Sequence, residues 1–280
     1  MTDLPPTSPP APDDALLSAV LDIAREAGRA IMRVYDSDFA VDHKADDSPL
    51  TLADREAHRI ITARLQSLTP HIPVLSEESP PEHHDFAIRR HWPTLWLVDP
   101  LDGTREFVKR NGEFTVNIAL IHAHRPLLGV IAIPAAGVAY TGATGSGAQR
   151  IRGMHPAEII RVRQPHPAVP VIVGSRSHRG ASTDALLNRL GPHELCAVGS
   201  ALKFCRVAEG HADFYPRLGP TSEWDTAAGQ AVLEAAGGQV LNLQGEALTY
   251  NRRDTLLNPD FMAIGDPHFV WRPLIAAGVS

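Results

Sequence analysis

The sequence has few cysteines. Only Cys196 and Cys205 occur among its 280 residues, and they form no C-x-x-C pair. This excludes a zinc knuckle and a dithiol redox motif, and two thiols do not make a disulfide framework. Such scarcity is typical of a reducing compartment, so we expect a cytoplasmic protein. Peripheral association with the inner membrane stays open, because the sequence carries no signal for or against it.

The chain also lacks long apolar runs and basic clusters. No apolar stretch of about 18 residues appears, which predicts that no segment spans a membrane. The net charge is −6 and no Lys/Arg-rich stripe occurs, so a nucleic-acid polymer is not an expected partner. A small anionic substrate stays open, because the charge at a site matters more than the total. Residues 1–12 contain five prolines and predict a disordered tail.

Hydrophobic residues make up 44% of the chain, which is enough for a substantial core. Their periodicity divides the sequence into an N-terminal α+β lobe (13–164) and a C-terminal α/β lobe (165–280). For the first lobe we expect helices over 13–35 and 51–68, strands over 72–75, 94–98, 114–122, 127–133 and 138–141, a loop over 80–84 and a glycine-rich turn over 142–147. For the second we expect strands over 169–173, 195–198, 212–215 and 239–243, alternating with helices over 182–190, 201–209 and 225–236.

Three acidic stretches stand out from this pattern. They are L-S-E-E at 75–78, D-P-L-D-G-T at 99–104 and E-W-D at 223–225. Each follows an apolar run or lies where a helix is expected to begin. Carboxylates that converge on one place need positive charge there, and hard divalent cations prefer oxygen ligands. Together the three stretches predict a metal-dependent phosphoester hydrolase.

The middle stretch is the most informative of the three. A strand delivers Asp99, Pro100 removes a ladder donor and so ends the strand, and Gly103 allows a turn that brings Asp102 back to the same space. A helix that begins at Thr104 would present free backbone N–H groups to a phosphate. A turn with an aspartate cap would explain the same residues without function. The spacing also differs from the D-x-D-G-T of phosphoaspartyl hydrolases, which favours a water molecule as nucleophile.

The other acids are weaker signals when they are taken alone. One of Glu77 and Glu78 is expected to face the site while the other faces away, and Asp225 could simply cap a helix. Asp54 and the Thr104 hydroxyl could together orient a water molecule, or each could cap its own helix. The histidines near 83–91 are best interpreted as surface residues, because they lack metal-ligand spacing.

The motifs as a set resemble the inositol monophosphatase superfamily. The D-P-L-D-G-T and E-W-D-T-A-A-G sequences at 99–104 and 223–229 look like its two signatures, and T-L-A-D at 51–54 and L-S-E-E at 75–78 match its other acidic positions. Within it, residues 107–120, 175–178, 200–210 and 215–217 are most similar to the bacterial 3′(2′),5′-bisphosphate nucleotidases. Position 201 is alanine where that subgroup would have serine, which weakens any side-chain contact there.

The resemblance implies a mixed α/β fold, a layered αβαβα sandwich with its site between two lobes. It implies two or three Mg²⁺ ions, replaceable by Mn²⁺, and sensitivity to lithium. The implied metal ligands are Glu77, Asp99, the Leu101 carbonyl, Asp102 and Asp225. Catalysis would involve Asp54, Glu77 and Thr104, and the substrate would be bound by Gly103, Thr104, His178, Ser200, Lys203, Arg217 and Asp225.

The implied reaction is removal of the 3′-phosphate of adenosine 3′,5′-bisphosphate, or of its sulfated relative. The product would be AMP or adenosine 5′-phosphosulfate. An inositol or sugar monophosphatase is the alternative, and an inactive nucleotide-binding sensor is a further one. The sequence leaves open whether the protein is a monomer or a homodimer.

Overall fold

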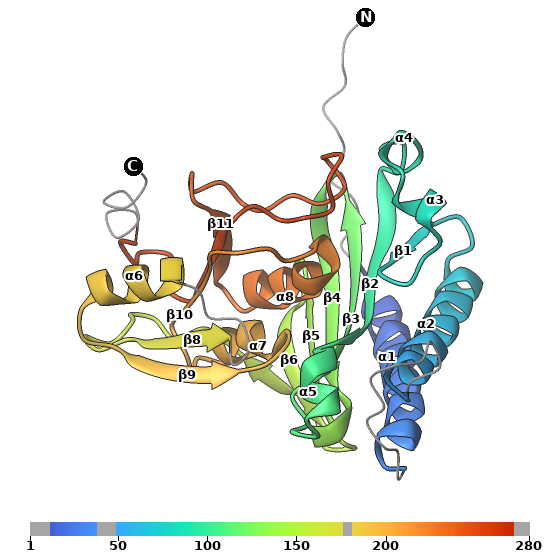
Figure 1. Ribbon diagram of the computed structural model, residues 1–280, viewed down its shortest axis with the longest axis horizontal. Helices are drawn as coiled ribbons and strands as arrows, with labels where there is room; N and C mark the ends of the chain where they lie inside the picture. The colour runs from blue at the N-terminus through green and yellow to red at the C-terminus, as the bar shows by residue number, and fades with distance from the viewer. Residues whose placement is uncertain (1–11, 38–48, 176–180, 272–280) are drawn as a thin grey trace, which may run out of the picture.

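Figure 1 shows a computed structural model of the protein, in which residues 12–37, 49–175 and 181–271 are described. Except for Pro12, the expected tail lies outside these residues. The helices are α1 (Asp14–Tyr35), α2 (Pro49–Leu68), α3 (Pro81–His84), α4 (Phe86–Arg89), α5 (Thr104–Val108), α6 (Ala181–Leu190), α7 (Leu202–Ala208) and α8 (Glu223–Ala235). The strands are β1 (Val74–Ser76), β2 (Thr94–Asp102), β3 (Thr115–His122), β4 (Arg125–Ile133), β5 (Val138–Ala143), β6 (Gly147–Arg152), β7 (Glu158–Ile160), β8 (Val171–Ser175), β9 (Glu194–Val198), β10 (Phe214–Arg217), β11 (Gln239–Asn242) and β12 (Phe261–Ile264).

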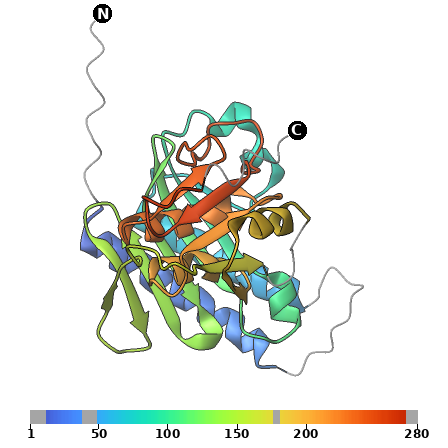
Figure 2. The same cartoon turned by 90° about the vertical axis from the view of Figure 1, so that its left-hand side faces the viewer.

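The strands form two sheets. The first has seven strands in the order β1 to β7, and only its β1–β2 pair is parallel. The second has the order β11-β12-β10-β8-β9, with β8 parallel to both β9 and β10. Figures 1 and 2 show α1 and α2 on one side of the first sheet, α7 and α8 between the sheets, and α6 outside the second. This arrangement confirms the predicted layered α/β fold.

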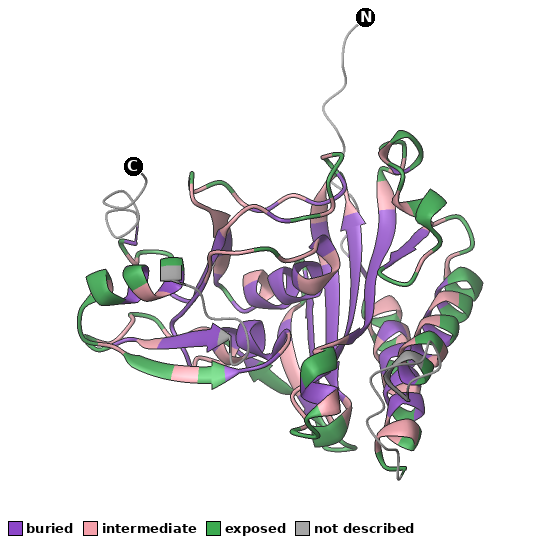
Figure 3. Ribbon diagram, viewed as in Figure 1, coloured by how far each residue is buried: buried purple, intermediate pink, exposed green. Residues whose placement is uncertain are grey.

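Burial explains the order of the layers. Helix α1 is capped by Asp13, whose Oδ1 accepts a hydrogen bond of 2.7 Å from the Leu16 N–H, and it buries the apolar face that contains Ile23 and Ile31. Helix α8 is instead buried along most of its length, as Figure 3 shows. A helix that is buried on most of its surface needs protein on both sides. The burial of α8, which includes its polar residues Glu223, Thr226 and Gln230, accords with its place between the two sheets.

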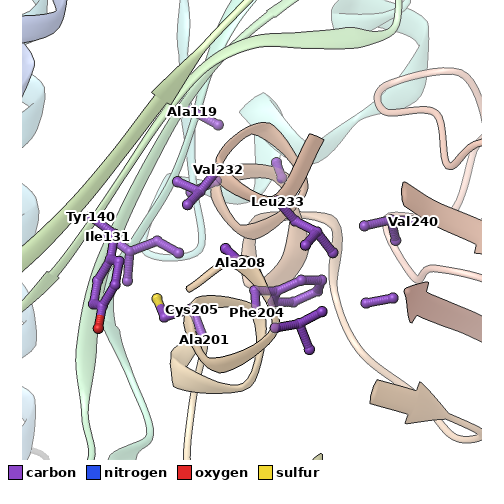
Figure 4. Packing of buried hydrophobic residues seen from close by; sticks show 14 of the residues in the cluster. Ala119, Ile131, Tyr140, Ala201, Phe204, Cys205, Ala208, Val232, Leu233 and Val240 are labelled. Carbon is purple, nitrogen blue, oxygen red and sulfur yellow. The ribbon is translucent and has the colours of Figure 1, made fainter. Parts of the chain in front are cut away.

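The core between the sheets is closely packed around α7 and α8 (Figure 4). Gly129 on β4 and Gly142 on β5 let α8 approach the first sheet, since a Cβ at Gly142 would lie 2.6 Å from the Val232 Cα atom. Phe204 on α7 fills the space beside Gly229 of α8. Such close backbone approach leaves little freedom for α8 to shift.

The structure corrects several expected elements. Strand β2 continues through Pro100 to Asp102, with a register shift between Asp99 and Asp102. Because this bulge leaves Pro100 out of the hydrogen-bonded pairing, the lack of a proline N–H distorts the strand and does not end it. Residues 81–84 form a helical turn, because Pro81 suits the first helical position. Strands β6, β7 and β12 were not expected, since they are short and the first two are largely polar.

Candidate active site

Two of the acidic stretches meet because β1 and β2 are parallel neighbours. Ser76 pairs with Val98, so Glu77 and Asp99 leave the sheet side by side. The Glu77 N–H donates to the Val98 carbonyl at 3.1 Å, which extends the pairing by one residue. Asp99 is almost completely buried, whereas Glu77 keeps an exposed surface.

The bulge in β2 brings Asp102 to the same place as Asp99. The Asp99 Oδ1 atom accepts the Leu101 N–H at 3.0 Å, which fixes the irregular turn. The Asp102 Oδ2 atom lies 3.4 Å from both the Thr115 Oγ1 and the Asn117 Nδ2 atoms of the neighbouring strand. Thr115 and Asn117 were not expected at the site, although their alternation with apolar residues in β3 is a signal that could have found them.

The third stretch arrives on α8. The Asp225 Oδ2 atom accepts the Ser222 N–H at 2.8 Å, so this residue does cap its helix. Carboxylate oxygens of Asp99, Asp102 and Asp225 nevertheless all lie within 4.8 Å of one another. Capping and site formation are therefore both compatible with the position of Asp225.

The cluster has the electrostatics of a cation site. Burial, followed by the neighbouring carboxylates, raises the pKa of Glu77 and of Asp225 to about 7 and that of Asp99 well above its usual range. Burial also raises the pKa of Asp102, although Lys203 opposes this shift. Mutual repulsion in a buried site is relieved by a cation. All these side chains offer oxygen atoms, and so they fit a hard divalent ion.

Asp54 on α2 lies at the same cluster. Burial and the carboxylates of Glu78 and Glu77 raise its pKa to about 8. Its Oδ1 atom is buried and has no hydrogen-bond partner, which also fits a site for a cation and its water. No hydrogen bond joins Asp54 to Thr104 within the described residues. Glu77 and Glu78 both lie near enough to Asp54 to raise its pKa.

A cavity of about 650 Å³ opens beside the acids. Gly103, at φ +92°, forms part of its wall, and a Cβ there would lie 2.1 Å from the Ser200 Oγ atom, so only glycine fits. Other residues that line the cavity include Asp102, Thr104, Ser200, Lys203, Tyr215, Arg217, Thr221 and Asp225.

Lys203 and Arg217 both line this cavity. Lys203 is buried, with Nζ 2.5 Å from the Ser200 carbonyl and 5.5 Å from the centre of the Tyr215 ring. Burial lowers its pKa to about 8 even though Asp102 opposes the shift. Arg217 donates to the Pro220 carbonyl at 2.7 Å, and its buried Nε has no partner. Both guanidinium and ammonium groups are suited to bind phosphate.

Ser200 joins the two sides of the cavity. Its Oγ atom lies 3.1 Å from the Asp102 carbonyl and 2.5 Å from that of Glu113. The Glu113 carboxylate in turn accepts the Gly199 N–H at 2.8 Å. Glu113 was not expected at the site. His178 lies outside the described residues.

In the described part of the chain, no helix is both long and apolar enough to cross a membrane.

Comparison with known proteins identifies the family. Residues 13–269 match the Inositol monophosphatase family. The 3′(2′),5′-bisphosphate nucleotidase CysQ of Escherichia coli strain K12 is 51% identical over 248 residues, which cover 88% of this chain and 98% of the relative. The crystal structure of CysQ from Bacteroides thetaiotaomicron has a TM-score of 0.82 and 42% identity, and covers 90% of this chain and 97% of that one.

A more distant structure agrees with this result. An inositol monophosphatase from Zymomonas mobilis is 25% identical, with a TM-score of 0.76 over 93% of this chain and 96% of its own. The predicted resemblance is therefore confirmed by sequence and by structure. The chain belongs to the inositol monophosphatase family.

Proposed function

We propose that this protein is a Mg²⁺-dependent 3′(2′),5′-bisphosphate nucleotidase. It removes the 3′-phosphate of adenosine 3′,5′-bisphosphate to leave AMP, and it accepts the sulfated relative in the same way. The observation that carries the proposal is one cavity with carboxylates at Asp102 and Asp225 and cations at Lys203 and Arg217. The 51% identity to nucleotidases named CysQ supports the same substrate class.

The acids have separate roles in this proposal. Two or three Mg²⁺ ions, or Mn²⁺ in their place, are held by the carboxylates of Glu77, Asp99, Asp102 and Asp225 and by the Leu101 carbonyl. When bound, such ions neutralise phosphate charge and activate water. Asp54, whose Oδ1 atom has no partner, works with the Thr104 hydroxyl to orient the attacking water and accept its proton.

The remaining residues bind the substrate. Gly103 and Thr104 hold the scissile phosphate by their backbone N–H groups, beside the metal ligand Asp225. The second phosphate and the nucleoside are bound by His178, Ser200, Lys203 and Arg217. We expect the enzyme to lie in the cytoplasm as a monomer or a homodimer. Lithium inhibits it by competing for a Mg²⁺ position.

Phosphate release tests the proposal directly. Adenosine 3′,5′-bisphosphate, inositol 1-phosphate and fructose 1,6-bisphosphate are compared with and without Mg²⁺. We expect a strong preference for the nucleotide that EDTA abolishes. Preference for inositol phosphate would leave the metal chemistry in place and remove the roles of Lys203 and Arg217. No release from any of the three would favour a binding protein.

A substitution at Lys203 tests whether this residue binds the second phosphate of the substrate. Lys203→Ala should impair turnover of the bisphosphate and spare that of a monophosphate, because only the bisphosphate presents a second anion to the Lys203 ammonium. Equal losses on both substrates would contradict the role given to Lys203.

A further inference from the structure

The three acidic stretches are not held together by one element. Strands β1 and β2 are paired, so Glu77 and Asp99 are fixed relative to each other by sheet hydrogen bonds. Asp225 belongs to α8, which lies in the next layer (Figure 1). The packing of α8 on the first sheet and the contacts at the N-terminus of this helix together set the distance between Asp225 and the other two acids.

The short segment from His84 to Arg89 contacts both sides. The His84 Nε2 atom lies 2.9 Å from the carbonyl oxygen of Ser76, the residue before Glu77. The centre of its ring is 5.6 Å from that of Trp224, the residue before Asp225. One side chain thus touches the neighbours of two acids that are far apart in the sequence.

Arg89 extends this connection into the protein interior. It is completely buried, and it donates to the His84 carbonyl and to the Asn251 Oδ1 atom, both at 3.0 Å, and to the Asp254 carbonyl. In return the Asn251 Nδ2 atom donates to the Arg89 carbonyl at 2.7 Å. A buried guanidinium with this many partners is held in a single arrangement.

Asn251 passes the connection to α8. Its backbone N–H donates at 2.7 Å to Glu223 Oε2, on the first residue of that helix. Glu223 is itself fully buried, and its Oε1 atom is 3.5 Å from the Arg253 guanidinium. Asn251 has φ +53°, a left-handed conformation that asparagine tolerates better than most residues.

We propose that Arg89 and Asn251 are positioning residues for the cation site. They hold the N-terminus of α8 against the end of β1, and so they set where the Asp225 carboxylate lies relative to Glu77. The inference rests on the proposed role of these acids as metal ligands. It adds that residues without any contact to a cation determine how well the cation binds.

The test measures metal binding without substrate. Mn²⁺ is titrated into metal-free protein by calorimetry, for the wild type and for Arg89→Lys and Asn251→Gly. Lysine keeps the positive charge but loses the several N–H donors of the guanidinium group. Glycine keeps the left-handed backbone and its N–H but loses the side-chain amide that bonds to Arg89. We expect Mn²⁺ affinity to fall by about 10–100-fold, as for other residues that orient metal ligands. The turnover number at saturating Mn²⁺ should remain close to that of the wild type.

Arg125 provides a matched control. It pairs with Glu234 at 3.0 Å near the opposite end of α8, so Arg125→Met also removes a tether of this helix. We expect it to lower the free energy of unfolding in urea with EDTA and to leave the Mn²⁺ dissociation constant unchanged.

The inference is overturned if Arg89→Lys and Asn251→Gly bind Mn²⁺ like the wild type, or if Arg125→Met weakens binding equally. It is overturned as well if the wild type binds no Mn²⁺. If Arg89→Lys does not fold, the Mn²⁺ affinity of Asn251→Gly alone tests the inference. Should the expected binding pattern appear without nucleotide hydrolysis, the proposed substrate is wrong and the positioning role stands.

Discussion

Asp102 differs from the other acids of the cluster in its surroundings. It lies next to the Lys203 ammonium and is held by Thr115 and Asn117. The amide in Asp102→Asn keeps the shape but loses the charge that a cation requires. We expect turnover at saturating Mg²⁺ to fall by roughly 100-fold or more, because metal stabilisation of phosphoryl charge amounts to several kcal/mol.

Phosphate release from adenosine 3′,5′-bisphosphate measures this effect, with circular dichroism to check the fold. Glu246→Gln, which changes an exposed acid paired with Asn242, serves as the control for lost charge. Activity of Asp102→Asn close to that of the wild type would remove Asp102 from the ligand set.

Lys203 should make the KM for the bisphosphate depend on pH. Its pKa in the free protein is about 8, below the ordinary value of 10.5, chiefly because it is buried. The ammonium is charged at pH 7 and mostly neutral at pH 9, whereas the substrate phosphates do not titrate in this range. We therefore expect the KM for the bisphosphate to rise roughly tenfold from pH 7 to pH 9.

Steady-state kinetics at several pH values check this, with Lys203→Arg as the comparison. A guanidinium stays charged at pH 9, so the KM of this variant should change little. Parallel profiles for the two proteins would assign the titration to another group.

At the scale of elements, local patterns predicted the long helices and the central strands. Helices α1 and α8 and strands β3 and β4 are long and rich in apolar residues, and they lie where the sequence indicated. Strands β7 and β12 have three and four residues, which is too short for periodicity to be recognised. The continuation of β2 through Pro100 depends on β3, whose pairing holds Asp102 beside Thr115.

The approach of α8 to the first sheet leads to a prediction at this scale. Gly142→Ala puts a Cβ 2.6 Å from the Val232 Cα atom and 2.9 Å from the Ala231 carbonyl oxygen, both of which are backbone atoms. We expect the free energy of unfolding to fall by about 1–3 kcal/mol, because that is the usual cost of overpacking a core. Urea unfolding measures it, with Gly174→Ala as control, because a Cβ at that strand glycine meets only Leu195 Cδ1 at 3.5 Å. Equal losses in the two variants would contradict the close packing of α8.

For the whole molecule, the acid cluster links stability to pH and to cations. The pKa values of Asp54, Glu77 and Asp225 are raised to about 8, 7 and 7. The folded protein therefore holds protons that the unfolded chain releases above about pH 4. Without metal, its stability should decline as the pH rises from about 4 to 8.

Thermal unfolding in EDTA and in Mg²⁺ tests this link. We expect the gain in Tm from Mg²⁺ to be small at pH 5 and to grow to several degrees at pH 8, because the cation binds ionised carboxylates in the folded state only. A gain that is independent of pH would show that the cation acts elsewhere.

The sequence by itself determined the family, the fold class and the oxygen chemistry of the candidate site. These depend on residue types at the ends of strands and at a helix start, which are local properties. Only the tertiary structure decided that Glu78 also acts on Asp54, that Asn117 contacts Asp102 and Glu113 contacts Ser200. It also decided that Arg89 connects to α8 through Asn251. Such contacts join segments that are distant in the chain, and they follow from the packing of layers, which periodicity does not encode.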